Sequence, residues 1–237
     1  MHLLDTTLGT LVENLALDEA LLLEAENGGP EVLRLWQWPV SAVVLGAGCK
    51  LNDDVNVPRC DADQVPILRR ASGGGTVLLG PGCLLFSLIL AYDTHPSLKE
   101  VRTSYAWILE RIAAGLTSLG FTLSAEGTSD LTLGQRKVSG NAQQRKRGHL
   151  LHHGTLLYDF DAAQAEHYLH QPGRQPDYRR QRGHGDFLGN LPTSADELRR
   201  MLCQAWNATT RLHEIPSDRV SRLVAEKYGV EAWIRRR

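Results

Sequence analysis

The stretch from Arg69 to Gly82 combines residue types that bind anions. Two adjacent arginines, Arg69 and Arg70, precede the glycine triplet Gly73–Gly75 and a Pro-Gly pair. Glycine has no side chain, so the triplet reaches left-handed backbone conformations and lets a ligand approach the main chain. Amide N–H groups exposed in such a turn form an anion-binding concavity, and a neighbouring arginine pairs with carboxylate or phosphate. The pattern indicates a ligand with an acidic end, although structural hairpin turns use the same residues.

A second group of chemically active side chains lies between residues 137 and 161. It contains Lys137, a Ser-Gly turn, an Asn amide and the adjacent His152 and His153. Because side chains alternate along a strand, one of these histidines is expected to face inward and the other outward. For the same reason Lys137 and Ser139 are expected to share a face. Taken alone, a strand lysine is most often solvated, and paired histidines without a third ligand are more often structural than metal-binding.

Hydrophobic periodicity predicts the elements that position these residues. Residues 11–25 form an amphipathic helix that carries Asp18 among its leucines. The clearest helix runs from Ser97 to about Leu119, with Ser97 and Glu100 in a capping-box pattern and Gly120 as its stop. Two further helical patterns lie at 195–208 and 216–227.

Short β-rich runs alternate with these helices. Residues 32–38 and 41–48 are expected to form a strand pair, and residues 50–66 a loop with at most a short helix. Residues 67–70 and 76–79 flank the glycine triplet as strands, and the polar segment 169–190 is a long surface loop. Further strands are expected at 83–92, 121–125, 130–134, 136–143 and 149–159, with a basic hairpin tip at 145–148. The order predicts an α+β fold with mixed strands and packed helices.

Composition narrows the class of protein. The 237 residues fit one large domain or two small ones, and we expect a single domain over residues 1–237. The net charge of −1 argues against a dedicated nucleic-acid binder. No apolar run approaches the length that spans a bilayer, and no secretory signal is visible at the N-terminus. The cysteines are scattered, which indicates reduced thiols in a cytoplasmic protein rather than a disulfide framework or zinc site. They are Cys49, Cys60, Cys83 and Cys203.

Taken together, the motifs resemble the lipoate–protein ligase A family, within the biotin/lipoate ligase and lipoyl-transferase superfamily. Four elements carry the resemblance in the family's order, at residues 69–77, 129–131, 137–142 and 152–156. The N-terminal run NLALDEALL and the run LRLWQW…VVLG are similar as well, so the resemblance covers about residues 10 to 205. The biotin ligase branch fits less well, because its arginine-rich GRGRxGR-like loop is absent.

The resemblance implies a catalytic domain with mixed, largely antiparallel sheets. It implies a ligase that uses ATP and Mg²⁺ to attach lipoate, or octanoate, to a lysine of a carrier domain through an acyl-AMP intermediate. Lys137 is the implied catalytic residue, which contacts the carboxylate and then the acyl-adenylate carbonyl. Arg70 is expected on the carboxylate or phosphate side, and Asp130 is expected to hold Mg²⁺ or ribose. The implied binding residues are Arg70, Ser72, Gly73, Gly74, Gly75, Thr76, Val77, Asp130, Ser139, Gly140, Asn141, Ala142, His153, Gly154 and Thr155.

The implied partners are lipoyl carrier domains, of the 2-oxoacid dehydrogenase E2 or glycine cleavage H protein type. The chain is expected to be a short form without the family's C-terminal accessory domain, since about 30 residues follow position 205. Short members can need a separate protein for adenylation. Leu79 also stands where the family often has histidine.

Two alternatives stay open. An octanoyltransferase that takes octanoyl groups from a carrier protein through a cysteine thioester is one, but residues 124–136 contain no cysteine and Cys83 does not match that nucleophile's position. The other is a protein that binds an acyl-adenylate or a lipoyl domain without catalysis, against which the retained Lys137 argues.

Overall fold

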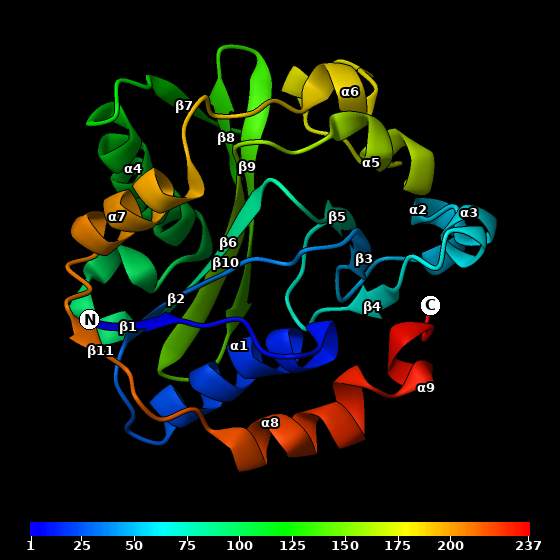
Figure 1. Ribbon diagram of the computed structural model, residues 1–237. Coiled ribbons are helices and arrows are strands. Elements are labelled where there is room, and N and C mark those ends of the chain that lie inside the picture. The colour runs from blue at the N-terminus through cyan, green and yellow to red at the C-terminus, as the bar shows by residue number, and fades with distance from the viewer.

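Two β-sheets form the framework of the computed structural model, which describes residues 1–237 (Figure 1). The larger sheet has eight strands and is antiparallel except where β1 runs parallel to both of its neighbours. Its strands in spatial order are β11 (Thr210–Arg211), β1 (His2–Asp5), β2 (Val32–Trp36), β6 (Cys83–Ala91), β10 (His149–Leu157), β9 (Arg136–Arg145), β8 (Asp130–Leu133) and β7 (Leu123–Glu126). The smaller sheet has the order β4 (Ile67–Arg69), β3 (Ala42–Leu45) and β5 (Val77–Leu79).

Strand β6 shows why the large sheet lies between two layers of helices. Its side chains alternate between two separate hydrophobic cores, with Leu84, Phe86 and Leu88 on one face and Leu85 and Ile89 on the other. Both faces are therefore apolar and both must be covered, as the continuous hydrophobic run of this segment requires.

One face of the large sheet is covered by α1 (Leu11–Glu26), α8 (Ser217–Leu223) and a π-helical turn at Val224–Tyr228. Helix α1 begins at a capping box formed by Thr10 and Glu13 and is buried on most sides, because the sheet and α8 cover it from opposite directions. The C-terminal helix α9 (Glu231–Ile234) lies beside β4.

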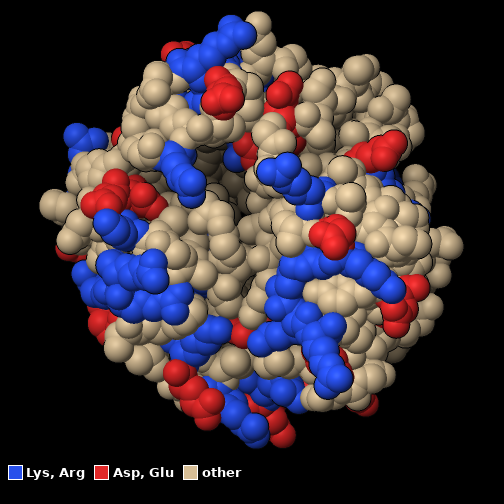
Figure 2. Space-filling view, turned by 180° about the vertical axis from the view of Figure 1, so that it is seen from behind, with Lys and Arg blue, Asp and Glu red and all other residues tan.

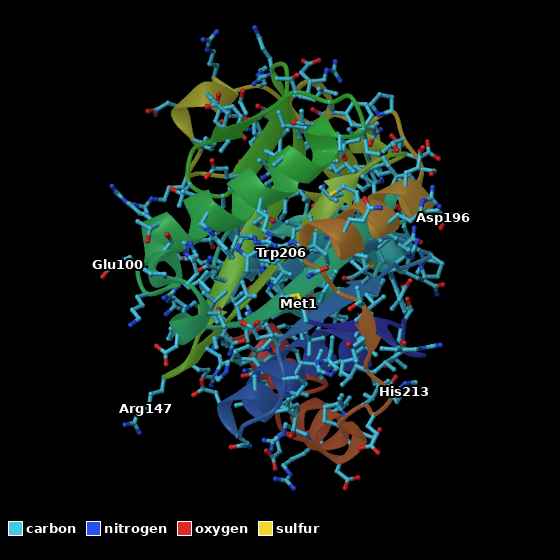
Figure 3. The ribbon with its side chains drawn as sticks, turned by 90° about the vertical axis from the view of Figure 1, so that its left-hand side faces the viewer. Met1, Glu100, Arg147, Asp196, Trp206 and His213 are labelled. Carbon is cyan, nitrogen blue, oxygen red and sulfur yellow. The ribbon has the colours of Figure 1, made fainter.

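The opposite face is covered by α4 (Val101–Thr117) and α7 (Ala195–Ala205), which lie side by side in Figure 3. Trp206, at the end of α7, meets Trp107 of α4 edge to face at a centroid distance of 5.6 Å. Four short helices lie at the other end of the molecule: α2 (Leu51–Asp54), α3 (Val57–Ala62), α5 (Ala162–Tyr168) and α6 (His184–Phe187). No helix combines the length and the apolar character that a bilayer-spanning segment needs.

The predicted α+β class is confirmed, and four predictions of local structure are wrong. Residues 50–66 contain two short helices, α2 and α3, instead of at most one. Residues 32–38 and 41–48 do not pair, because β2 joins the large sheet and β3 the small one, each between two other strands. The Ser97–Glu100 capping box does not form, since Pro96–Leu98 turns as a 3-10 helix and α4 begins only at Val101. Segment 169–190 is not a plain loop, because it contains a 3-10 turn at Asp177–Arg179 and helix α6.

Candidate active site

A cavity of about 1070 Å³ opens between the two sheets and the segment 170–188. One part of its wall is apolar and includes Leu15, Trp36, Val44, Leu85, Leu157 and Phe160. The other part is polar and brings together the glycine triplet, Asp130, Lys137 and Arg179. Figure 2 shows a face of the molecule that is hollowed near its upper centre, with Lys and Arg side chains on both sides of the hollow. The cavity therefore suits a ligand with an apolar chain and an anionic end.

The glycine loop, Gly73–Gly75, lines this cavity. The carbonyls of Gly73 and Gly75 accept hydrogen bonds from Nη2 of Arg70, at 2.6 and 2.8 Å. Gly74 lies at φ +84°, in the left-handed region that favours glycine. The three amides donate to no protein acceptor, and all three residues are exposed. Carbonyls held inward and amides left free make the concavity that binds an anion.

Arg70 lines the cavity, and most of its N–H donors are used by the protein, chiefly by the glycine loop. Its expected place beside a ligand carboxylate or phosphate stays a prediction. Besides the two glycine carbonyls, its guanidinium donates to Ser72 Oγ at 2.9 Å and to the Val44 carbonyl at 3.2 Å. Burial lowers the pKa of Arg70 to about 10, so the group stays charged at neutral pH. No carboxylate pairs with it, and its charge therefore favours an anion at the loop.

Lys137 lies in the cavity wall at a β-bulge. Its Nζ pairs with Oδ1 of Asp130 at 2.8 Å, and Oδ2 of Asp130 accepts from Tyr178 Oη at 2.6 Å. A Cβ atom on Gly140 would lie 2.7 Å from Cε of Lys137, so a glycine there gives the lysine its path across the strand. An ammonium has three donors, and the ion pair uses one of them.

Ser139 does not share the face of Lys137. The pairing of β8 with β9 shifts between Leu131 and Thr132, so that Ser139 opposes the first and Lys137 the second. One extra residue in β9 reverses the alternation of side chains. Ser139 is fully buried and bonded to Asn141 instead of lining the cavity.

The paired histidines occupy opposite faces of β10, but neither faces bulk solvent. His153 lies at the cavity wall and its side chain is 15% exposed. His152 is fully buried on the α4 side, where it bonds Asn141 Oδ1 and packs against Phe86. Burial lowers the pKa of His152 to about 3, so it is neutral. The prediction that one of the two histidines faces outward is wrong, because helices cover both faces of the sheet.

The structure brings most of the predicted site residues to one cavity. Those that line it are Arg70, Gly73, Gly74, Gly75, Thr76, Val77, Asp130, Lys137, Gly140, Asn141, Ala142, His153, Gly154 and Thr155. Ser72 lies directly behind the glycine loop and Ser139 lies in the core. Position 154 requires glycine for a steric reason, since a Cβ there would overlap Oδ1 of Asn141.

Sequence reasoning missed several residues that belong to this wall. Arg179 is buried, lines the cavity and has one guanidinium nitrogen without a partner. His184 lies beside it, and burial together with Arg179 lowers its pKa to about 4. No periodic pattern marks these residues, because the segment that carries them has little regular structure. Asp18 was visible as an acid in an apolar helical stripe, and it also lines the cavity.

Replacing Gly46 with alanine is expected to destabilise the fold by about 1–3 kcal/mol, because a Cβ there overlaps the carbonyl of Gly74 and approaches Arg70 Nη2. Urea denaturation measures this change. Gly80→Ala is the matched control, since its Cβ meets only ordinary contacts with Ser41 in an equally buried position. Equal stability of both variants would contradict the close packing of the loop against Gly46.

Residues 10–202 match the model of the family described as lipoyl protein ligase A/B catalytic domain. A relative named probable lipoate-protein ligase A, from Mycoplasma pneumoniae, is 33% identical over 157 residues, which are 66% of this chain and 45% of that protein. The chain thus spans less than half of this relative. Other matched relatives are named octanoyltransferase LipM.

Two solved structures share the fold. A bi-partite lipoate protein ligase of Thermoplasma acidophilum, described with its E2 lipoyl domain, gives a TM-score of 0.84 at 22% identity, over 99% of this chain and 95% of that chain. A lipoate-protein ligase A bound with ATP gives 0.83 at 22% identity, over 99% and 98%.

Proposed function

Because this chain belongs to the family of lipoyl protein ligase A/B catalytic domains, we propose that it is an enzyme that transfers a lipoyl or octanoyl group to a lysine of a carrier protein. More specifically, we propose a lipoate–protein ligase that forms an acyl-AMP intermediate from ATP and lipoate or octanoate. The observation that carries this proposal is the cavity, in which an apolar wall adjoins the free amides of the glycine loop and the ammonium of Lys137.

The apolar wall takes the acyl chain. Leu15, Trp36 and Leu157 come from α1, β2 and β10, so the pocket is built on the rigid core rather than on loops. Each buried methylene of an acyl chain contributes about 0.8 kcal/mol to binding. The carboxyl end then lies toward the polar wall, where the glycine loop and Lys137 are.

Lys137 supplies the positive charge for both steps. In the first, a carboxylate oxygen attacks the α-phosphorus of ATP and pyrophosphate leaves. In the second, the neutral ε-amine of the carrier lysine attacks the acyl carbon, and AMP leaves as the amide forms. Negative charge develops near the acyl and phosphoryl oxygens in both, and Lys137 has two donors free to stabilise it while the third holds Asp130.

Mg²⁺ would enter with the phosphates of ATP rather than bind to a preformed protein site. No group of three His, Cys, Asp or Glu side chains is placed to hold a metal. Both oxygens of Asp130 are engaged, by Lys137 and Tyr178. The role of Asp130 as a magnesium or ribose ligand stays a prediction, and no step of the proposed reaction depends on it.

The thioester alternative finds little support in the cysteines. Cys83 is fully buried, outside the cavity wall, and burial raises its pKa to about 12. Cys49 does line the cavity, but burial and then Asp54 raise the pKa of its thiol as well. A nucleophilic cysteine needs a lowered pKa, because the thiolate is the reactive form.

The proposed partners are lipoyl carrier domains of the E2 or H-protein type. A relative named octanoyl-[GcvH]:protein N-octanoyltransferase and the E2 lipoyl domain studied with the Thermoplasma ligase support this class. We propose that residues 1–237 form a single catalytic domain that needs a separate accessory protein for adenylation, and the description of that ligase as bi-partite supports a second protein.

Purified protein with ATP, Mg²⁺ and lipoate is expected to add one lipoyl group to a lysine of a lipoyl domain, which intact-mass measurement detects. Supplying preformed lipoyl-AMP in place of ATP and lipoate separates transfer from activation. If only the preformed adenylate supports transfer, an accessory activating protein is required. Modification by octanoyl-carrier protein without ATP, with an acyl group on Cys49 or Cys83, would refute the adenylate mechanism. Tight binding of lipoyl-AMP without turnover would identify a non-catalytic binder.

A further inference from the structure

A continuous network of buried and partly buried hydrogen bonds links helix α1 to the glycine loop. Oδ2 of Asp18 lies 3.1 Å from Nδ1 of His153, and Nε2 of His153 lies 2.6 Å from Oγ of Ser72. Nε of Arg70 donates to the same hydroxyl at 2.9 Å, and Nη2 of Arg70 donates to the glycine-loop carbonyls. Asp18 and Ser72 are 3% and 1% exposed, and His153 between them is 15% exposed at the cavity wall, so most of these bonds are at least partly shielded from water.

The groups at the two ends of this hydrogen-bond network determine which atom donates and which accepts in each bond. Asp18 is anionic, because Arg34 at 2.6 Å and the hydrogen bond from His153 outweigh the effect of burial and hold its pKa below the ordinary value. Its carboxylate places the imidazole proton of His153 on Nδ1, which leaves Nε2 as an acceptor. Ser72 therefore donates to His153 and turns its lone pairs to Arg70.

The connectivity of Asp18, His153 and Ser72 is that of a hydrolytic nucleophile triad. The surroundings of Ser72 exclude that use here. Its hydroxyl does not reach the cavity wall, and it already accepts from the Arg70 guanidinium. The hydrogen-bond network ends at backbone carbonyls of the glycine loop, so its effect is to hold the conformation of that loop.

We propose that Asp18, His153 and Ser72 are positioning residues that orient Arg70, so that the carbonyls of Gly73 and Gly75 stay inward and the loop amides converge on the phosphate of an acyl-adenylate. This inference rests on the proposed function for the identity of the ligand. The conformation of the loop follows from the bonds alone. Loss of the Ser72 hydroxyl frees Arg70 to rotate, and the loop then samples arrangements in which its amides no longer converge.

Ser72→Ala tests the proposal against Ser104→Ala. Ser104 is an equally buried serine whose hydroxyl also accepts from an arginine, Arg145, and it lies outside the cavity wall. In the wild type and in Ser104→Ala, ¹⁵N order parameters of Gly73–Gly75 are expected near 0.85, and in Ser72→Ala below about 0.6. The Kd of octanoyl-AMP, measured by calorimetry, is expected to rise roughly tenfold in Ser72→Ala, which is about 1.4 kcal/mol.

Two substitutions of His153 separate its contacts. Asn at this position keeps an amide near Asp18 but does not reach Ser72, whereas Gln places an amide oxygen near the position of Nε2 and restores the acceptor. His153→Gln is expected to keep the order parameters of the loop close to those of the wild type, and His153→Asn to lower them as Ser72→Ala does. A purely structural role of His153 would affect both variants equally.

The outcomes separate the two proposals. If the wild type does not bind octanoyl-AMP, the proposed function fails. The order parameters of Gly73–Gly75 still decide whether the hydrogen-bond network positions the loop. A rigid loop with unchanged affinity in Ser72→Ala would overturn the positioning role. So would an acyl group on Ser72 after incubation with octanoyl-AMP, detected by peptide mass spectrometry, since Ser72 would then be a nucleophile.

Discussion

Lys137→Ala is expected to lower the rate of carrier acylation by at least about 10³-fold while the protein stays folded. The ammonium is the proposed source of positive charge beside the reacting carbonyl and phosphoryl oxygens, and removal of one such donor from an enclosed site costs about 10²–10³-fold in other enzymes. A full charge in two successive steps is expected to reach or exceed the upper end of this range. Single-turnover acylation followed by intact-mass measurement gives the rate.

Asp130→Asn is the informative companion to this variant. It removes the carboxylate that pairs with Lys137 but keeps a polar side chain that Tyr178 can contact. We expect a smaller loss than in Lys137→Ala, because the ammonium remains. Acylation at the wild-type rate in Lys137→Ala, with a lipoyl domain as acceptor, would show that the lysine does not take part in the chemistry.

Arg34→Met is expected to destabilise the protein by about 3–5 kcal/mol, the largest stability effect that the structure predicts. Arg34 is fully buried and pairs with the buried carboxylate of Asp18, and removal of one partner leaves an uncompensated charge in the core. Urea denaturation at pH 7 measures the free energy of unfolding. The double variant Asp18→Asn/Arg34→Met removes both charges and is expected to recover part of the loss.

The difference in the free energy of unfolding between the wild type and Arg34→Met is expected to become smaller at acidic pH. The pKa of Asp18 is held below its ordinary value of 3.8 in the folded protein, so its contribution to stability is present above pH 3.8 and is lost as the pH falls through the lower, folded-state pKa. In Arg34→Met, burial instead raises this pKa, and protonation relieves the charge earlier. A stability difference that stays constant from pH 7 to pH 3 would contradict this account, as would a loss below about 1 kcal/mol at pH 7.

The sequence predicted the elements near the chemistry better than their connections. The alternation in β6 and β10 and the leucine stripe of α1 follow directly from periodicity, because these segments bury one or two complete faces. The placement of β2 and β3 in different sheets has no local signal, since both are short, apolar runs that pair with strands distant in sequence.

Side-chain roles were harder to predict than positions. Lys137 and the glycine loop do meet at one cavity, but most donors of Arg70 hold the loop itself, which the sequence did not indicate. A sequence shows that an arginine is near a glycine turn and not which acceptors lie within its reach. The exchange of faces at Ser139 depends on a single-residue bulge, which residue types do not reveal.

The division of the core into two clusters has a consequence for how this protein can change over time. No residue of α4 or α7 lines the cavity, and the core beneath these helices lies almost entirely on the far side of the large sheet. Substitutions in the layer under α4 and α7 are therefore expected to change the thermal stability of the protein without changing its ligand specificity. The cavity side carries the opposite constraint, because α1 and β10 serve the fold and the ligand at once. Under the proposed function, selection for a new acyl chain length would therefore act on residues whose replacement also carries a stability penalty.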